Sequence, residues 1–276
     1  MTAEFGSDRA AASSTPDGRG RRVGASYDVR YQETVAEFAE FLSDLGLSHV
    51  EMRAEALYAH PDAPTPRALR ELAAREDLTY TVHLPFRDVN PGSFDDAARE
   101  AAVEELKQSL SAAAIAGAGA AVYHPGSVPK RYPEYVRGKA RENALDSLRR
   151  LVAHAEAVGV PLCVENLRAK PKAIRHTSSV AELDSFLRDA GVDSEYLGVT
   201  LDVGHAKVND TDLDAFLDRF GDRVEVVHLH DNDGRSDSHD PMPEYEDVVS
   251  RIDAPYNVLE MKSYADIEAS VDGESE

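Results

Sequence analysis

Short apolar runs that end in a metal-binding type of residue recur along this chain of 276 residues. The runs are rich in β-branched residues, as strands are. They read TYTVH, AAVYH, PLCVE, GVTLD, EVVHLH and NVLE, and they carry His83, His124, Glu165, Asp202, His228 and Glu260. In a (β/α)8 barrel, the parallel strands deliver such side chains to one rim, where the active site lies. The pattern therefore predicts an enzyme with a divalent metal.

The runs alternate with amphipathic helical segments over most of the chain. The expected strands are Val23–Val29 and the segments LSHVEMR, LTYTVHLP, GAAVYHPG, PLCVEN, YLGVTLDVGHA, VEVVHLHDN and YNVLEMKS. The expected helices are Thr34–Leu45, a helix opened by Thr65 and Pro66, Ser93–Ala116, Pro133–Val158, Val180–Ala190 and Asp212–Phe220, with a last helix that is short or missing. Eight strands alternating with helices favour a closed parallel barrel in a single domain over an open sheet. No GxGxxG follows the first strand, so the sequence does not predict the usual dinucleotide-binding site.

The first 22 residues differ in composition from the rest. They are rich in Ala, Ser, Gly, Pro and Arg, so we predict a disordered tail over residues 1–22 and the barrel domain over residues 23–276. We expect no membrane span and no signal peptide, because no apolar stretch is long enough for the first and the start has no apolar segment for the second. The single cysteine, Cys163, is expected to be buried. Without a disulfide framework, the cytoplasm is the expected compartment.

The net charge of −21 is unusual for a chain of this length. Only 7 of the 30 basic residues are lysine, and the acidic residues are spread over most helices, which is typical of proteins adapted to high salt. At molar salt the screening length is only about 3 Å, so the surface repulsion is weak. The charge argues against a nucleic acid partner without excluding it. The sequence is compatible with a homo-oligomer.

Four of the strand-end residues form the predicted core of the site. Glu165, Asp202, His228 and Glu260 end the fifth to eighth strands, which are neighbours in a barrel. A single residue of this kind is often a salt-bridge partner or an ordinary rim residue, but four in consecutive strands favour a metal site. Carboxylates with an imidazole suit Mn²⁺ or Zn²⁺ best, with Mg²⁺ and Co²⁺ as alternatives.

Other polar residues are candidates for the same site. We expect His230 either to support His228 or to replace it as the ligand, because side chains two residues apart share a strand face. We prefer His228. Lys262 and His230 are candidates for substrate binding. The further residues that could bind a metal, orient a substrate or fix a loop are His83, His124, His205, Asp237 and His239.

Four segments resemble the xylose-isomerase-like TIM barrels, a superfamily that includes sugar phosphate isomerases and epimerases and endonuclease IV. The segments are VYHPGS at 122–127, VENL at 164–167, TLDVGHA at 200–206 and HLHDNDGRSDSH at 228–239. In the epimerase branch, a Glu, an Asp, a His and a second Glu bind one divalent metal, and they match the four core residues. In endonuclease IV, nine ligands hold three zinc ions, and all nine positions have a chemically matching residue here.

The resemblance implies a sugar or sugar-phosphate isomerase or epimerase. In that branch, Glu165 and Glu260 would remove and return a proton on opposite sides of the reacting carbon, while the metal stabilises an enediolate. The glycine-rich stretch that endonuclease IV carries after its ENT is replaced here by RAKPKAIRHTSS. Likewise DPMPEYED replaces a P-x-G-x-G turn common among the isomerases, so the loop after the seventh strand differs. The alternatives are an apurinic/apyrimidinic endonuclease with three zinc ions, a dehydratase and a non-catalytic barrel that binds a metal or a sugar.

Overall fold

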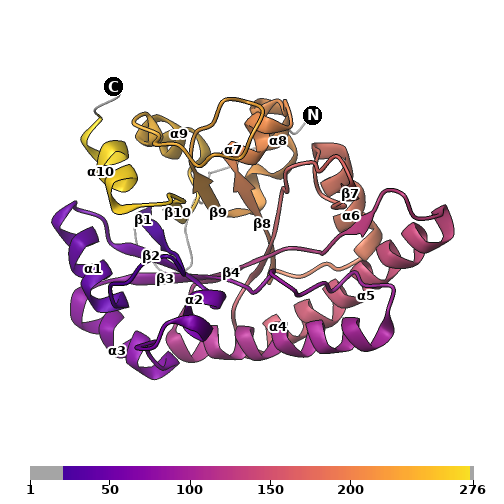
Figure 1. Cartoon of the computed structure of the whole chain (residues 1–276), viewed down its shortest axis with the longest axis horizontal. Helices are drawn as coiled ribbons and strands as arrows, with labels where there is room; N and C mark the ends of the chain where they lie inside the picture. The colour runs from indigo at the N-terminus through magenta and orange to yellow at the C-terminus, as the bar shows by residue number, and fades with distance from the viewer. Residues whose placement is uncertain (1–20, 274–276) are drawn as a thin grey trace, which may run out of the picture.

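The structure of the protein is a computed structural model that describes residues 21–273. Eight parallel strands form a closed barrel in the order β1-β10-β9-β8-β6-β4-β3-β2, with helices around it (Figure 1). This confirms the predicted (β/α)8 barrel in a single domain. The barrel strands are β1 (Arg22–Tyr27), β2 (His49–Arg53), β3 (Thr79–His83), β4 (Ala120–Tyr123), β6 (Leu162–Glu165), β8 (Leu197–Asp202), β9 (Val224–Leu229) and β10 (Tyr256–Leu259).

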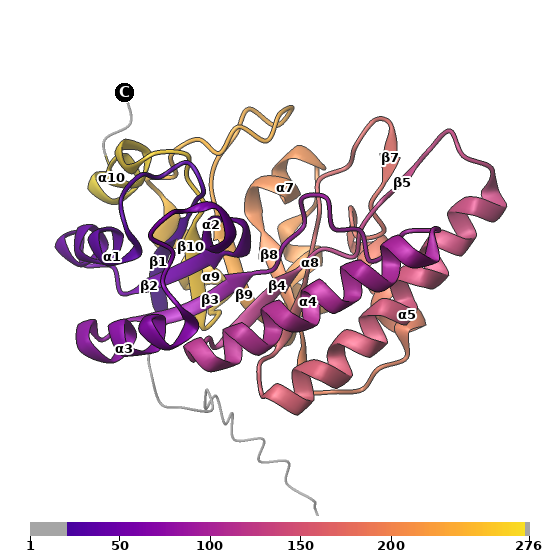
Figure 2. The same ribbon diagram turned by 60° about the horizontal axis from the view of Figure 1, so that its bottom comes forward.

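The helices surround the barrel, and the two longest, α4 and α5, lie side by side along one flank (Figures 1 and 2). Short polar side chains cap most of the predicted helices: Thr34 caps α1, Thr65 caps α3 and Asp95 caps α4. The helices are α1 (Val35–Asp44), α2 (Ala54–Ala59), α3 (Pro66–Glu76), α4 (Asp96–Ala116), α5 (Glu134–Val158), α6 (Val180–Ala190), α7 (Val203–Val208), α8 (Leu213–Phe220), α9 (Tyr245–Ile252) and α10 (Tyr264–Asp272), with a 3-10 turn η1 at Gly221–Arg223.

Some boundaries differ from the prediction. The first strand ends at Tyr27 rather than Val29, because Asp28 starts a turn that Tyr31 closes through its backbone N–H. The third predicted helix starts at Asp96, since the Asp95 side chain accepts from the first-turn N–H groups. Helices α2 and α9 were not predicted, because neither has a capping side chain at its start, whereas Asp212 caps the equally short α8. Residues 1–20 of the predicted tail lie outside the described residues, and β1 begins at Arg22.

A second, two-stranded sheet lies on the rim that holds the carboxyl ends of the barrel strands. Strand β5 (Val128–Pro129) pairs antiparallel with β7 (Ala173–Ile174), and both project beyond the barrel above α5 (Figure 2). The pairing joins the loop after β4 to the loop after β6. This sheet is absent from the sequence prediction, because two-residue strands leave no pattern.

The main core lies between the barrel and its helices, whereas a second, smaller cluster of strand residues contains Cys163, which is fully buried, as predicted. Inside the barrel several polar side chains are also fully buried, among them His49, Glu51 and Thr81. Buried polar groups are stable only where they are hydrogen-bonded. No helix among residues 21–273 combines the length and the apolarity that a membrane crossing requires.

Candidate metal centre

Four neighbouring strands bring the predicted core residues together. Strands β6, β8, β9 and β10 are consecutive in the barrel. Asp202 pairs in register with His228, Glu165 ends β6, and Glu260 directly follows β10. All four side chains are buried. Asp202 and His228 therefore lie between the two glutamates along the rim, which places a carboxylate at each end of the group.

Three histidines surround the Glu165 carboxylate. Its Oε2 lies 2.6 Å from His124 Nε2 and 3.6 Å from His83 Nε2, and its Oε1 lies 3.0 Å from His205 Nδ1. Burial opposes ionisation of Glu165, but the attraction of His124 and the other histidines outweighs it and holds the pKa well below its usual range. The carboxylate is therefore ionised, and three imidazoles from β3, the β4 loop and α7 converge on it.

Asp202 both ends β8 and starts α7. Its Oδ1 accepts the His205 backbone N–H at 2.6 Å, which caps the helix and turns the chain back toward the site. The same carboxylate lies 3.1 Å from His230 Nε2 and 3.8 Å from His228 Nδ1. Both histidines of the HLH segment therefore face Asp202, as expected for residues that share a strand face. The geometry therefore brings both candidate metal ligands, His228 and His230, to the site.

Arg53, at the end of β2, contacts Glu260 over the intervening strand β1. The two form a direct ion pair, and Arg53 Nη1 also lies 3.2 Å from Asp28 Oδ2. Burial raises the pKa of Glu260, but Arg53 and then His228 outweigh burial and lower it to about 2. A buried arginine between two carboxylates fixes the position of the Glu260 side chain. The sequence analysis missed both Arg53 and Asp28.

Glu51 on β2 is the other residue that the sequence analysis missed. It is fully buried, and its Oε1 and Oε2 lie 3.1 Å and 3.3 Å from His228 Nε2. Thr81 donates a hydrogen bond of 3.1 Å to the same carboxylate, and His49 Nε2 lies 3.0 Å from Thr81 Oγ1. This chain of contacts orients the His228 ring, so that its Nδ1 faces Glu260 at 3.6 Å.

The loop after β9 folds over the site. Asp231 and Asp240 close the loop by two backbone hydrogen bonds of 2.9 Å. Within it, Asp237 lies 3.4 Å from His205 and 3.6 Å from His239, whose ring stacks on His230. His239 adopts a left-handed backbone conformation, and its Nδ1 lies 2.6 Å from the Glu260 carbonyl oxygen. Lys262 donates to the Ser238 carbonyl and so attaches the loop to the segment after β10.

The residues fit a divalent metal. Among residues 21–273, four groups of three residues have ligand atoms close enough to share an ion. His228 Nδ1 and Asp237 Oδ1 are buried and have no hydrogen-bond partner among the described residues, which is rare for buried polar atoms. Imidazole nitrogens with carboxylate oxygens suit Mn²⁺ or Zn²⁺. The groups are His83, His124 and Glu165; Glu165, Asp202 and His228; Asp202, His230 and Glu260; and His230, Asp237 and His239.

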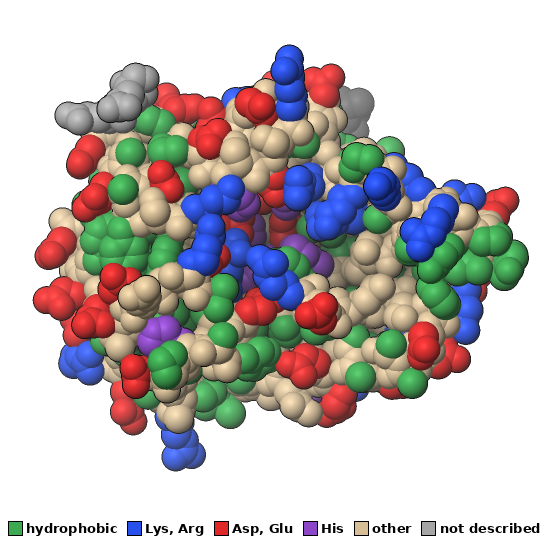
Figure 3. Space-filling model, in the orientation of Figure 1, with side chains coloured by type: hydrophobic (Ala, Val, Ile, Leu, Met, Phe, Trp, Pro, Cys, Tyr) green, Lys and Arg blue, Asp and Glu red, His purple; other side chains and the backbone are tan. Residues whose placement is uncertain are grey.

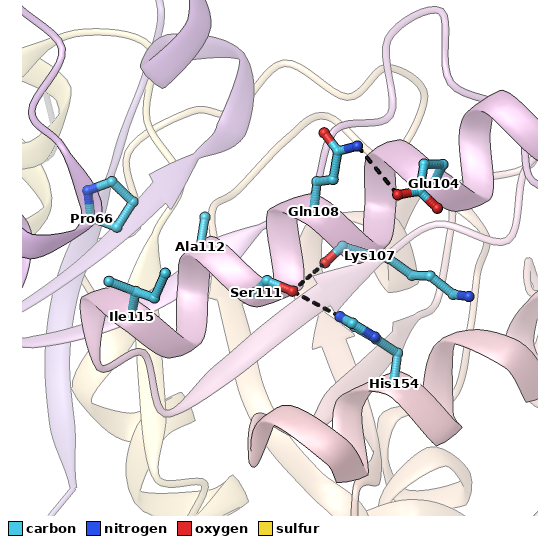
Figure 4. Close-up of a pocket in the computed structure, with 8 residues that line it drawn as sticks. All are labelled: Pro66, Glu104, Lys107, Gln108, Ser111, Ala112, Ile115 and His154. Carbon is cyan, nitrogen blue, oxygen red and sulfur yellow. Dashed lines mark hydrogen bonds between the residues drawn. The ribbon is translucent and has the colours of Figure 1, made fainter.

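The centre lies in a hollow that basic side chains surround. Figure 3 shows histidine and acidic side chains inside a central depression, with Lys and Arg side chains on its rim. A different cavity of about 490 Å³ lies on the outside of the barrel between α4 and α5 (Figure 4). Ser111 and His154 lie 2.9 Å apart there, but Ser111 already donates to the Lys107 carbonyl. His154 therefore donates to Ser111 and does not activate it as a nucleophile.

Comparison with protein families gives one match that covers most of the chain. A family model described as xylose isomerase-like TIM barrel matches residues 39–271. An uncharacterized protein of Methanocaldococcus jannaschii is 31% identical over 173 residues, which are 62% of this chain and 57% of that protein. An uncharacterized protein of Sinorhizobium fredii is 26% identical over 235 residues, which cover 76% of this chain and 72% of that protein. The match thus spans less than two thirds of the Methanocaldococcus relative.

Solved structures with the same fold include sugar epimerases. A D-tagatose 3-epimerase-like protein is 24% identical with a TM-score of 0.75, and the match covers 91% of this chain and 94% of that one. An L-ribulose 3-epimerase is 17% identical with a TM-score of 0.68, over 93% and 87% of the two chains. A D-psicose 3-epimerase is 19% identical with a TM-score of 0.66, over 86% and 83%. At these identities the likeness establishes the fold alone.

Proposed function

The chain belongs to the xylose isomerase-like TIM barrel family, and from this premise we propose that it is a divalent-metal-dependent isomerase or epimerase of sugars or sugar phosphates. The sugar epimerases among the structural neighbours support the proposal at the level of the fold. The observation that carries it is the arrangement of two buried glutamates, Glu165 and Glu260, at the two ends of a group that also contains Asp202 and His228.

The proposed metal ligands are these four side chains. Mn²⁺ or Zn²⁺ bound there would supply Lewis-acid stabilisation of the negative charge that develops on the substrate oxygens. The remaining polar residues around the group would orient the substrate or complete the ligand set. They are His83, His124, His205, His230, Asp237, His239 and Lys262.

Glu165 and Glu260 are the proposed proton carriers. Isomerisation moves a proton between adjacent carbons, whereas epimerisation removes it from one face of a carbon and delivers one to the other face. Carboxylates on both sides of a reacting carbon can do either. Arg53 holds Glu260, and His124 and His205 hold Glu165, so each carboxylate has a fixed position. Fixed positions matter because proton transfer requires hydrogen-bond reach of the reacting carbon.

Solvent isotope exchange tests this assignment. Metal-loaded protein is incubated in D₂O with a panel of ketoses, aldoses and their phosphates, and deuterium at the carbon beside the carbonyl is measured by mass spectrometry and NMR. We expect Glu165→Gln and Glu260→Gln each to lower the rate by at least about 100-fold, the usual scale of a general base. Glu225→Gln makes the same change near the amino end of β9, outside the group of ligand-type residues, and serves as the control. Metal content is measured on every sample. Unchanged turnover in Glu260→Gln would refute the proton-transfer role.

A second function is supported by a different observation. The four groups of ligand-type residues together include eight of the nine strand-end and loop residues that match endonuclease IV. The ninth, His205, lies outside these groups, but its Nδ1 is 3.0 Å from Glu165 Oε1. With three zinc ions, the chain would hydrolyse the phosphodiester at abasic DNA sites. Against this, the net charge of −21 disfavours contact with a phosphate backbone.

Metal stoichiometry separates the two functions. Elemental analysis of protein purified without chelators should give close to one metal per chain for the isomerase and close to three zinc ions for the nuclease. His83→Ala and His239→Ala should abolish cleavage of an abasic oligonucleotide if the chain is the nuclease. Unchanged metal content and activity in both variants would eliminate the nuclease.

A further inference from the structure

A cavity of about 390 Å³ opens beside the candidate metal centre. The loops after β3, β4 and β6 form its walls. One residue, His124, belongs to both the cavity and the centre, because its Nε2 lies 2.6 Å from Glu165. Whatever fills this cavity therefore lies next to a molecule bound at the centre. Its lining residues are Phe86, Arg87, Asp88, Val89, Asn90, His124, Gly126, Ser127, Leu167, Lys170 and Arg175.

Three of the lining side chains are cations without a carboxylate partner. None of Arg87, Lys170 and Arg175 forms an ion pair with any of the described residues, although Arg87 lies over the Phe86 ring. The nearby Arg168, in contrast, is neutralised by Asp237 at 3.1 Å. The only acidic lining residue is the exposed Asp88. The cavity thus has a formal charge of +2 in a chain whose net charge is −21.

The cations repel one another in the absence of a ligand. Partial burial and then the nearby Arg175 and Arg168 lower the pKa of Lys170. Burial is also the main cause that lowers the pKa of Arg175, and the attraction of the more distant Glu165 opposes it only in part. Arg175 is half-buried, whereas Arg87 and Lys170 are exposed, and an anion bound between them would be stabilised by all three charges.

The cavity is held in shape by contacts between its loops. The Asn90 side chain donates to the Ser127 carbonyl at 2.9 Å and accepts from the Ser127 backbone N–H at 3.2 Å. Gly126 has a left-handed backbone conformation, and a side chain there would overlap Asn90. Pairing of β5 with β7 places Arg175 directly after β7. The Ser127 hydroxyl makes no hydrogen bond to the described residues, so it is free to donate to a ligand.

We propose that this cavity binds the phosphate group of a phosphorylated sugar whose reacting carbon lies at the metal centre. The inference rests on the proposed function and narrows its substrate class. A phosphate monoester carries about −1.5 to −2 charges at pH 7, which matches the +2 of the cavity better than the single charge of a carboxylate does. Arginine also presents paired N–H donors that fit phosphate oxygens.

Two measurements test the proposal. First, inorganic phosphate is titrated calorimetrically into chelator-treated protein at low salt, so that no metal competes for the anion. Second, kcat/KM is compared for matched pairs of a ketose and its phosphate, and for sugars with a carboxylate in place of the phosphate. The variants are Arg175→Ala and Lys170→Ala. Lys172→Ala, an exposed lysine of the same loop outside the cavity, is the matched control.

The expected loss of phosphate affinity follows from the free energy that a charge-assisted hydrogen bond contributes. Arg175→Ala and Lys170→Ala should each weaken phosphate binding and lower kcat/KM for the sugar phosphate by about 10- to 100-fold. Turnover of the unphosphorylated sugar should change by less than about threefold, and Lys172→Ala should change neither. A larger loss for the carboxylated sugars than for the phosphates would overturn the phosphate assignment.

The failures of the two proposals are distinguishable. Equal kcat/KM for a ketose and its phosphate, unaffected by either variant, would overturn the cavity assignment while the isomerase stands. Loss of inorganic phosphate binding in Arg175→Ala would support the anion site even if no sugar is turned over, in which case the isomerase falls. Cleavage of an abasic oligonucleotide that depends on Arg175, without sugar turnover, would overturn the sugar-phosphate proposal.

Discussion

Glu51→Gln is the change that should weaken metal binding without removing a proposed ligand. Glu51 is fully buried, and both of its oxygens lie within 3.3 Å of His228 Nε2. Burial lowers the pKa of His228, but the negative charge of Glu51 and then that of Glu260 outweigh burial and raise it, which makes the ring a better electron donor. Glutamine keeps the size and the hydrogen-bonding oxygen but removes the charge.

The expected loss of metal affinity in Glu51→Gln follows from the contact between Glu51 and His228. A hydrogen bond to a carboxylate contributes about 1.5–3 kcal/mol and one to a neutral amide about 0.5–1.5 kcal/mol, so the substitution loses on the order of 1 kcal/mol in this bond. Loss of the charge also lowers the basicity of the ring. Substitution of a carboxylate that supports a metal-binding histidine typically costs about 10- to 100-fold in affinity, and we expect this range for Mn²⁺ or Zn²⁺.

The assay is calorimetric titration of Mn²⁺ and Zn²⁺ into chelator-treated protein. Glu225→Gln, near the amino end of β9 and outside the group of ligand-type residues, is the matched control and should bind both metals as the wild type does. Circular dichroism melting curves check that each variant is folded. A dissociation constant for Glu51→Gln within about twofold of the wild type would refute the role of Glu51 in holding His228 for the metal.

Three further predictions concern residues that position the centre. Burial lowers the pKa of His49 from 6.5 to about 4, so between these pH values the unfolded chain binds more protons than the folded one. About 3 kcal/mol of unfolding free energy, fully present above pH 6.5, should be lost as the pH falls to about 4, and urea titrations of His49→Gln should show a flatter pH dependence. Gly204→Ala should cost about 1–3 kcal/mol, because the new side chain would overlap the His230 ring; an unchanged melting temperature would contradict this. Arg53→Ala should destabilise the metal-free protein by about 3–5 kcal/mol in urea unfolding, since it leaves Glu260 buried without its partner, and Arg53→Lys should recover part of the loss. Equal losses of unfolding free energy in Arg53→Ala and Arg53→Lys would show that the positive charge at position 53 does not cause the destabilisation.

The barrel could be predicted from the sequence because its signals are local. Strand and helix periodicity, the capping residues Thr34 and Thr65, and the strand-end positions of Glu165, Asp202 and Glu260 are all visible within a few residues of chain. Parallel strands of a closed barrel end at one rim, so residues at their ends meet there whatever the details of packing. The helices α2 and α9 and the β5–β7 pair were not predicted, because the formation of such short elements depends on the tertiary contacts around them.

Only the tertiary structure determines which residues support the centre. In the segment HVEMR, Glu51 and Arg53 look like ordinary charges of a solvent-exposed strand, and nothing nearby marks them as buried. Glu51 contacts His228, 177 residues away, and Arg53 contacts Glu260, 207 residues away. Only closure of the barrel brings these pairs together and excludes water from them. Because an ion pair has large effects on pKa and stability only when it is buried, the chemistry of these residues follows from the closed barrel and not from the local sequence.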